Sequence, residues 1–163
     1  MPQKKGGGVR PGQAGGFTLI ELISVMLMLG IVAALAVPTF NTASIDVETA
    51  AQAVRADIRF TQQLAVGRNP AAAGDIGITF TPGATSYTVP DPSGIFNTTR
   101  NLPNNVTVSS VTIPGAPTAN ALSFNRYGEP EITLGAQAVI QIQAGGQTKT
   151  LTVQQFTGRV TLS

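Results

Sequence analysis

The sequence predicts an α+β protein in which one long N-terminal helix packs on a mainly antiparallel β-sheet domain. Three observations predict this: an apolar run from Phe17 to Val37, an amphipathic helical pattern after it, and short alternating runs of Thr, Val and Ile beyond Pro70. Helices on one face of an antiparallel sheet define the α+β class. We therefore expect four parts: residues 1–16, 17–38, 39–68 and 69–163.

The apolar run carries a single charged residue, Glu21. A helix over its roughly 21 residues covers ~30 Å, the thickness of the bilayer hydrocarbon. Its twelve Leu, Ile, Val and Phe side chains favour insertion by about 5 kcal/mol, against a cost of about 3 kcal/mol for a central carboxylate. The sequence therefore predicts one membrane-spanning helix over residues 17–38.

The residues before this run are basic. Lys4, Lys5 and Arg10 are accompanied by no acid up to Gly16. By the positive-inside rule, this end is expected to stay in the cytoplasm and the part after the helix to lie on the other side of the membrane.

The junction between the basic end and the apolar run reads Gly15-Gly16-Phe17-Thr18-Leu19-Ile20-Glu21. It resembles the class III leader of type IV prepilins and type II secretion pseudopilins. The resemblance implies cleavage after Gly16 by prepilin peptidase and N-methylation of Phe17 as the new first residue. It also places Glu21 at the fifth mature position, where the family keeps a glutamate for processing and assembly.

Gly30 and Pro38 also stand at positions familiar in pilin N-terminal helices. In the family the segment between these positions can unwind in filaments, which a weak helix former and a proline permit. An ordinary kink is the alternative reading for this pair.

The resemblance implies that residues 1–16 are a leader that is removed. It implies a single-pass protein of the bacterial inner membrane with a cytoplasmic N-terminus and a periplasmic C-terminal domain, which can also enter a pilus. The implied partners are other pilin or pseudopilin subunits, prepilin peptidase, the inner-membrane assembly platform and the inner membrane.

Glu21 has one good partner in this scheme, the α-ammonium group of Phe17 on a neighbouring subunit. A buried carboxylate and a buried amine each cost several kcal/mol alone, and pairing offsets much of that cost. The alternative is that Glu21 reaches the membrane surface and serves the peptidase only.

Two simpler readings of the apolar run remain open. Ala34-Leu35-Ala36 would make a signal-peptidase site, although the run is longer than the usual 7–15 residues of a signal peptide and has a glutamate near its start. The second reading is a plain membrane anchor with a chance glutamate. Neither reading requires Gly16 to precede Phe17.

Composition excludes several kinds of chemistry. The chain has no Cys and no His, so disulfides, thiol catalysis and a histidine base are excluded. Without the three basic residues of the leader, seven of the ten bases face all eight acids, and 7 − 8 gives a formal net charge of −1. Glu129 and Glu131 are interpreted as acids of a solvated turn. We predict no catalytic residue, metal or cofactor: the chain is expected to be a substrate of enzymes and not an enzyme.

The helical pattern resumes after Pro38 with an apolar stripe at about 3.5-residue spacing. Pro38 predicts a kink within one nearly continuous helix from Phe17 to about Val66. Gly67, Asn69 and Pro70 supply the stop signals.

Beyond Pro70, alternation between turn clusters predicts short strands. The clearest hairpin turns at Gly145-Gly146. Residues 96–103 and 114–120 are predicted to be loops. The expected strands cover residues 76–80, 87–89, 106–113 with a bulge, 122–124, 132–134, 138–142, 149–153 and 160–162.

This half of the chain resembles the GspH/FimT family of H-type pseudopilins and minor pilins. The features are the L-S-F-x-x-x-G element at Leu122 to Gly128, the paired strands from Val139 to Val153, and Gly158-Arg159-Val160. The resemblance implies a minor subunit of a type II secretion system or a type IV pilus, acting in protein secretion or pilus biogenesis.

A DNA-binding minor pilin of natural transformation is one alternative function, and a major pilin is another. Arg159 matches the first arginine of a basic element credited with DNA contact in some relatives, but no second arginine follows it. Each phosphate contact needs a cation. Nucleic acid is therefore the less favoured partner.

Overall fold

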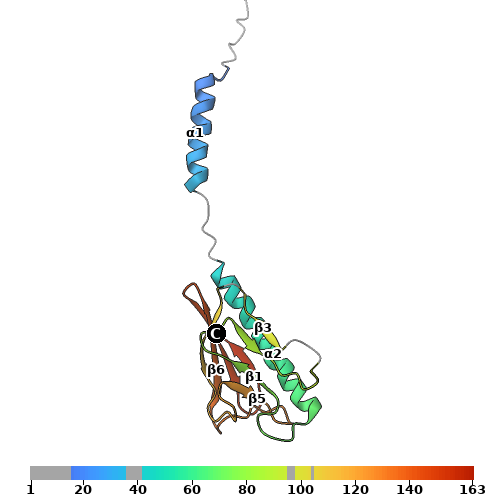
Figure 1. The fold of residues 1–163 in the computed structure, drawn as a ribbon. Coiled ribbons are helices and arrows are strands. Elements are labelled where there is room, and N and C mark those ends of the chain that lie inside the picture. The colour runs from blue at the N-terminus through green and yellow to red at the C-terminus, as the bar shows by residue number, and fades with distance from the viewer. Residues whose placement is uncertain (1–15, 36–41, 95–97, 104) are drawn as a thin grey trace, which may run out of the picture. The chain divides into compact units, whose positions relative to one another are not determined.

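The structure is a computed structural model that describes residues 16–35, 42–94, 98–103 and 105–163. It divides into two compact units, residues 1–40 and 41–163. The predicted kink at Pro38 and the basic residues of the leader lie outside the described residues. The first unit contributes one described helix, and the second contains the second helix and every described strand (Figure 1).

The described residues form two helices, α1 from Leu19 to Leu35 and α2 from Ala43 to Arg68. The predicted stop of the second helix is confirmed. Asn69 takes the left-handed conformation with φ of 52°, and its N–H donates to the carbonyl oxygen of Ala65 at 3.0 Å. A left-handed residue with this hydrogen bond is a common way to end a helix.

The predicted fold class, one long helix packed on a sheet, is wrong. The described residues show two helices of 17 and 26 residues and no single long one, and the described strands form two sheets of four. One sheet of eight strands would be ~38 Å wide, whereas a helix is only ~10 Å across. A single helix cannot cover such a sheet, but two smaller sheets can close around one helix.

The predicted membrane span is also wrong. Within the described parts of the chain, no helix combines the length and the apolarity needed to cross a membrane. α1 covers about 26 Å, against ~30 Å of bilayer hydrocarbon. The inner-membrane location with a cytoplasmic N-terminus and a periplasmic domain was derived from that span, and it is corrected with it.

All described strand pairs are antiparallel. We call the sheet of order β3-β2-β1-β5 sheet A and the sheet of order β4-β6-β7-β8 sheet B. The strands of sheet A are β1 (Gly77–Phe80), β2 (Ser86–Thr88), β3 (Thr99–Asn101) and β5 (Ala121–Ser123). Those of sheet B are β4 (Thr107–Thr112), β6 (Gln137–Ala144), β7 (Gln147–Gln154) and β8 (Val160–Leu162).

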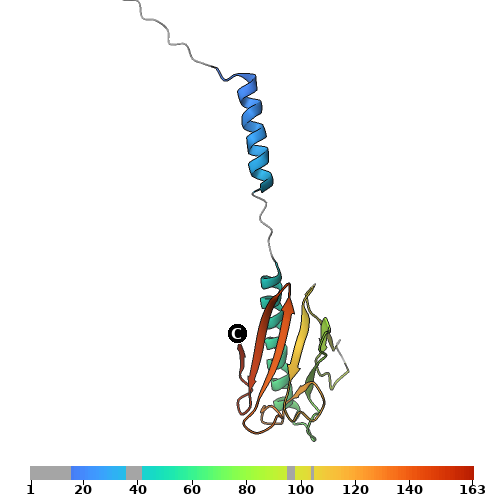
Figure 2. The ribbon, with the colours of Figure 1, turned by 90° about the vertical axis from the view of Figure 1, so that its left-hand side faces the viewer.

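Sheet B contains the predicted hairpin. β6 and β7 pair over eight residues each, from Gln137 opposite Gln154 to Ala144 opposite Gln147, and Gly145-Gly146 forms the turn. The predicted bulge is confirmed as well, because the register of β4 shifts between Val108 and Ser110. These long strands run beside α2 (Figure 2).

One hydrophobic core joins α2 to the inner faces of both sheets. The helix contributes a stripe that includes Val47, Val54 and Ile58, all buried. A fully buried aliphatic side chain stabilises a fold by about 1.5–3 kcal/mol relative to exposure. The largest buried side chains of the sheets and loops are Phe80, Phe124, Ile78, Leu122, Ile140, Ile142, Leu151, Val89 and Val106.

Candidate functional site

α1 exposes apolar side chains on every side. The exposed fraction of its described large apolar side chains runs from 48% at Ile23 to 79% at Leu19. Between them the helix carries one acid, Glu21, in its first turn, and no base in its last turn. A helix that is apolar all round is stable only where something covers it.

The first turn of α1 is capped by Thr18. The N–H of Glu21 donates to Thr18 Oγ1 at 3.3 Å and to the Thr18 carbonyl oxygen at 3.1 Å. This is the N-terminal half of a capping box, and an acid near the N-terminus also interacts favourably with the helix dipole. The sequence interpretation overlooked Thr18, although the spacing Thr-x-x-Glu before an apolar run was the available signal.

The structure brings two of the predicted site residues together. Phe17 and Glu21 line a hollow of about 270 Å³ with Leu22 and Val25. Phe17 itself is 85% exposed. The ring and the carboxylate are therefore both accessible at the start of α1.

The two predicted glycine positions of this unit have open surroundings. A Cβ atom built on Gly16 or on Gly30 would meet no heavy atom within 4 Å. Gly16 lies just before the helix and is exposed, and Gly30 is an exposed position inside α1. The absence of a side chain at Gly30 therefore leaves room for another helix to pack closely there.

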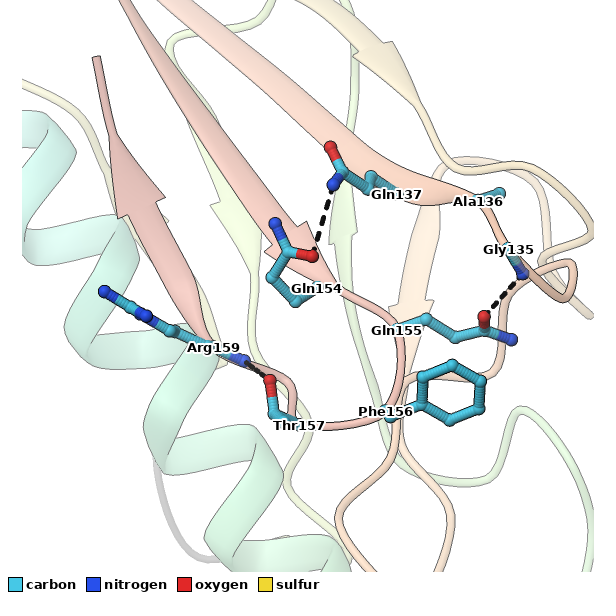
Figure 3. Close-up of a pocket in the computed structure, with 8 residues that line it drawn as sticks. All are labelled: Gly135, Ala136, Gln137, Gln154, Gln155, Phe156, Thr157 and Arg159. Atoms are coloured by element: carbon cyan, nitrogen blue, oxygen red, sulfur yellow. Dashed lines mark hydrogen bonds between the residues drawn. The ribbon is translucent and has the colours of Figure 1, made fainter.

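Arg159 lies far along the sequence from these residues, in the second unit, at a cavity of about 380 Å³ (Figure 3). The cavity lies where β6 begins and β7 ends, and the turn from β7 to β8 forms its rim. Its lining residues are Gly135, Ala136, Gln137, Gln154, Gln155, Phe156, Thr157 and Arg159. Arg159 contributes the one cation of this lining, and no acid belongs to it.

The two acids beside Pro130 are not simply solvated, as the sequence interpretation had them. Glu131 Oε2 accepts the N–H of Gly74 at 2.8 Å, and Glu129 Oε2 accepts Asn125 Nδ2 at 2.9 Å. The Glu131 carboxylate therefore links two loop segments that are far apart in sequence, and the Glu129 carboxylate holds the side chain of Asn125 within the same turn.

A polar cluster joins α2 to sheet A. Tyr87 donates its hydroxyl hydrogen to Asp57 Oδ2 at 2.8 Å, and Arg100 Nε lies 3.6 Å from the same oxygen. Burial raises the pKa of Tyr87, and the hydrogen bond to Asp57 raises it further. The cluster has a structural role, because the one carboxylate of α2 contacts a side chain from β2 and another from β3.

A second ion pair lies nearer the N-terminus of α2. Lys149 Nζ of β7 lies 3.2 Å from Glu48 Oε2. The hydrogen bond from Gln52, followed by the contact with Lys149, lowers the pKa of Glu48. Both partners are substantially exposed, so the pair contributes little to stability.

The chain was compared with protein-family models, with curated proteins and with solved structures, and none of the three comparisons found a match.

Proposed function

We propose that this chain is a minor pseudopilin or minor pilin, a filament subunit of a type II secretion system or a type IV pilus. Prepilin peptidase would process it after Gly16, and it would assemble through α1. The observation that carries the proposal is that α1 exposes its described apolar side chains on all sides. In a filament whose α1 helices bundle together, the helices of neighbouring subunits would bury these side chains.

The exposed apolar surface of α1 is large enough to support such a bundle. Eleven large apolar side chains of α1 are between about half and four-fifths exposed. Covering each one releases on the order of 1 kcal/mol or more, at roughly 25 cal/mol per Å² of apolar surface. The sum, about 11 kcal/mol or more, is of the same order as the cost of association, which is about 4–15 kcal/mol.

The start of α1 supplies the polar element of the proposal. Glu21 is the one charged residue of the helix, and it lies one turn from Phe17 beside an open hollow. Once a new terminus is created at Phe17, its ammonium group and the Glu21 carboxylate of a neighbour would pair. A subunit in the wrong register would leave both charges unpaired, so the pair would select the register.

Processing is tested by producing the full chain with and without prepilin peptidase and measuring its mass. We expect loss of residues 1–16 and one methyl group on Phe17. Gly16→Val should block cleavage, whereas Gly15→Ala, the matched change one residue earlier, should leave it intact. A chain that stays whole beside an active peptidase, or one that starts at Val37, would contradict the proposal.

Assembly is tested with Glu21→Gln, which removes the charge and keeps the shape. Incorporation is counted per processed chain, because the family keeps this glutamate for processing as well. Among processed chains, we expect this variant to be at least about tenfold less abundant in purified filaments, since a lost charge pair costs more than 1.4 kcal/mol. Ser24→Ala is the control, because Ser24 is an exposed polar residue of the same helix. Equal incorporation of both variants would refute the role of Glu21.

A further inference from the structure

One flank of α2 carries two arginines. Arg55 is seven residues from both Glu48 and Gln62, which contact β7 and the turn after it. Residues seven apart lie on the same face of a helix, so Arg55 lies on the flank that faces sheet B. Arg59 lies one turn further along this flank and is exposed. The flank is therefore positively charged over at least one helical turn.

Both arginines lack a partner among the described residues. In these parts of the chain no ion pair involves them, and the Nε atom of Arg55 is buried without a hydrogen-bond acceptor. Like charges four residues apart destabilise a helix, and a buried donor without an acceptor carries a desolvation cost. An acidic partner would reduce both costs.

Arg159 adds a third cation near this flank. It follows Gly158, which lies against the side chain of Gln62 on α2. Its guanidinium group points away from Gln155 and Phe156 (Figure 3). Among the described residues it forms no ion pair. We call Arg55, Arg59 and Arg159 the basic flank.

The outer face of sheet A carries acids instead. A cavity of about 310 Å³ lies on this face, because the residues of β1 that line it alternate with buried ones. Asp75 and Asp91 line the cavity, and no base belongs to its lining. Glu131 lies beside it, since its carboxylate accepts the N–H of the lining residue Gly74 at 2.8 Å. We call this hollow the acidic cavity.

One base reaches the neighbourhood of the acidic cavity. Arg68, the last residue of α2, donates to Ser93 Oγ in the loop that follows Asp91. Three acids therefore face one base in this region, and Asp75 and Glu131 form no ion pair among the described residues. The region keeps a net negative charge.

The basic flank and the acidic cavity lie on different sides of the second unit. In Figure 2, β8 ends at the C-terminus on the left, whereas β2 and β3 of sheet A, green to yellow, lie on the right. Charge and shape both match, because long arginine side chains project from the flank and the cavity offers carboxylates with the hydroxyls of Thr79 and Thr118. A contact between two different sides of one kind of chain is heterologous and can repeat from copy to copy.

We propose that a second copy of this chain docks its basic flank on the acidic cavity. Guanidinium groups of the flank hydrogen-bond the carboxylates of Asp75 and Glu131, and two parallel bonds to one carboxylate are the strongest arrangement. Exposed ion pairs are individually weak, so the contact alone leaves dilute second units monomeric. Association of the full chain through α1 raises the effective concentration of these domains, and the contact then forms.

The chain has no Cys, so disulfide trapping between introduced cysteines tests the contact. One full-length chain carries Gln63→Cys, at an exposed position one turn beyond Arg59, and a second carries Thr118→Cys at the cavity. Ala53→Cys is the matched control, because Ala53 is exposed on the other flank of α2, one turn from Asp57.

The two chains are mixed in a polyoxyethylene detergent at low salt and oxidised. We expect the heterodimer between positions 63 and 118 to form at least about fivefold faster than the one between positions 53 and 118. Raising the salt to about 0.5 M should remove this advantage, because exposed charge pairs are screened.

Charge variants separate a specific contact from random collision. Arg59→Gln should remove most of the rate advantage. Thr148→Glu changes the net charge by the same one unit at an exposed position of β7 outside both regions, and it should keep the advantage. Arg59→Glu on one chain and Asp75→Lys on the other should each remove the advantage alone and restore it together. The unfolding midpoint of each variant verifies its fold.

Several outcomes would overturn the proposal. They are equal rates for positions 63 and 53, an Arg59→Gln chain that keeps its advantage, or no recovery in the charge-swapped pair. Protection of position 63 from oxidation by a DNA tetramer, without trapping between copies, would assign the flank to nucleic acid instead. Detergent-dispersed chains with an uncleaved N-terminus suffice, so a failed contact leaves the proposed function in place, and failed processing leaves this test in place.

Discussion

At the scale of single residues, Asp57 has a central role because one carboxylate joins three elements. It lies on α2 and accepts the hydroxyl of Tyr87 from β2, while Arg100 of β3 lies beside it. The sheet A edge is made of three-residue strands, which hold few ladder hydrogen bonds. Side-chain ties of this kind therefore anchor that edge to the helix.

Tyr87→Phe should lower the free energy of unfolding by about 1–3 kcal/mol, because a partly buried hydrogen bond to a charged group is lost while the ring is kept. Urea denaturation of the full chain in detergent measures this change. Tyr127→Phe is the control, since Tyr127 is 74% exposed, and it should change stability by less than about 0.5 kcal/mol. Equal effects would mean that the Asp57 contact adds nothing.

The same tyrosine predicts a pH dependence. Burial and the Asp57 hydrogen bond raise the pKa of Tyr87 in the folded state, whereas the unfolded tyrosine titrates near pH ~10. The folded state therefore binds the proton more tightly. Its contribution is complete below pH ~10 and is lost as pH rises above that value. The urea midpoint should fall in this range, and more steeply for the wild type than for Tyr87→Phe.

Gln62 is the second residue whose loss should be costly. Its Nε2 group donates to the carbonyl oxygens of Gly128 at 2.7 Å and Thr157 at 3.1 Å. Gln62→Ala should therefore cost about 1–3 kcal/mol, since two loop carbonyls lose a donor. Its exposed neighbour Gln63 is the control, and Gln63→Ala should cost less than about 0.5 kcal/mol. Thermal unfolding of both variants measures these two costs, and equal losses of stability would contradict the role of Gln62.

At the scale of elements, periodicity predicted the β6–β7 hairpin and the end of α2, because both depend on neighbours in sequence. It failed at two places. Residues 132–134 were predicted as a strand, but the structure has no strand there, and the nearest pairing is an isolated bridge from Phe124 to Pro130. β3, at Thr99–Asn101, was predicted as part of a loop. Its burial pattern offers no apolar alternation, and it is a strand because β2 lies beside it.

Close packing between β1 and β5 gives a prediction at this scale. A Cβ atom on Gly77 would lie 2.7 Å from Ser123 Oγ and 3.3 Å from Ser123 Cα. Gly77→Ala should therefore cost about 1–3 kcal/mol by overpacking. Gly67→Ala is the matched change in open space near the end of α2, and it should stabilise by up to about 1 kcal/mol through helix propensity. If both substitutions changed the free energy of unfolding in the same direction, the close packing at Gly77 would be contradicted.

At the scale of the whole molecule, the two units differ in how they treat their apolar side chains. The second unit buries a single core between α2 and two sheets, whereas the first exposes its apolar side chains. Folding and association should therefore be separable properties of the two units.

We expect a fragment of residues 41–163 to unfold cooperatively, with a midpoint within a few degrees of that of the full chain, since the hydrophobic core lies within it. It should stay monomeric without detergent, while the full chain associates through α1. Light scattering and thermal unfolding measure both properties. A fragment that fails to fold would show that residues 1–40 contribute to the domain.

The candidate sites divide in the same way. Phe17 and Glu21 are four residues apart, on either side of the Thr18 cap, so local geometry brings them together and the sequence was enough to predict both positions. The row of Gln137, Gln154 and Arg159 was not predictable, because strand register between distant segments creates it. Arg159 was noted as a lone cation, but nothing local indicated its neighbours.

The sequence by itself determined the apolar character of α1, the stripe of α2 and the alternation of the longest strands, because these properties depend on residues within a few positions of one another. Only the tertiary structure decided that the strands form two sheets around α2 and that a cavity opens beside Arg159. The choice of partner strands depends on contacts between distant segments, and no local period encodes it.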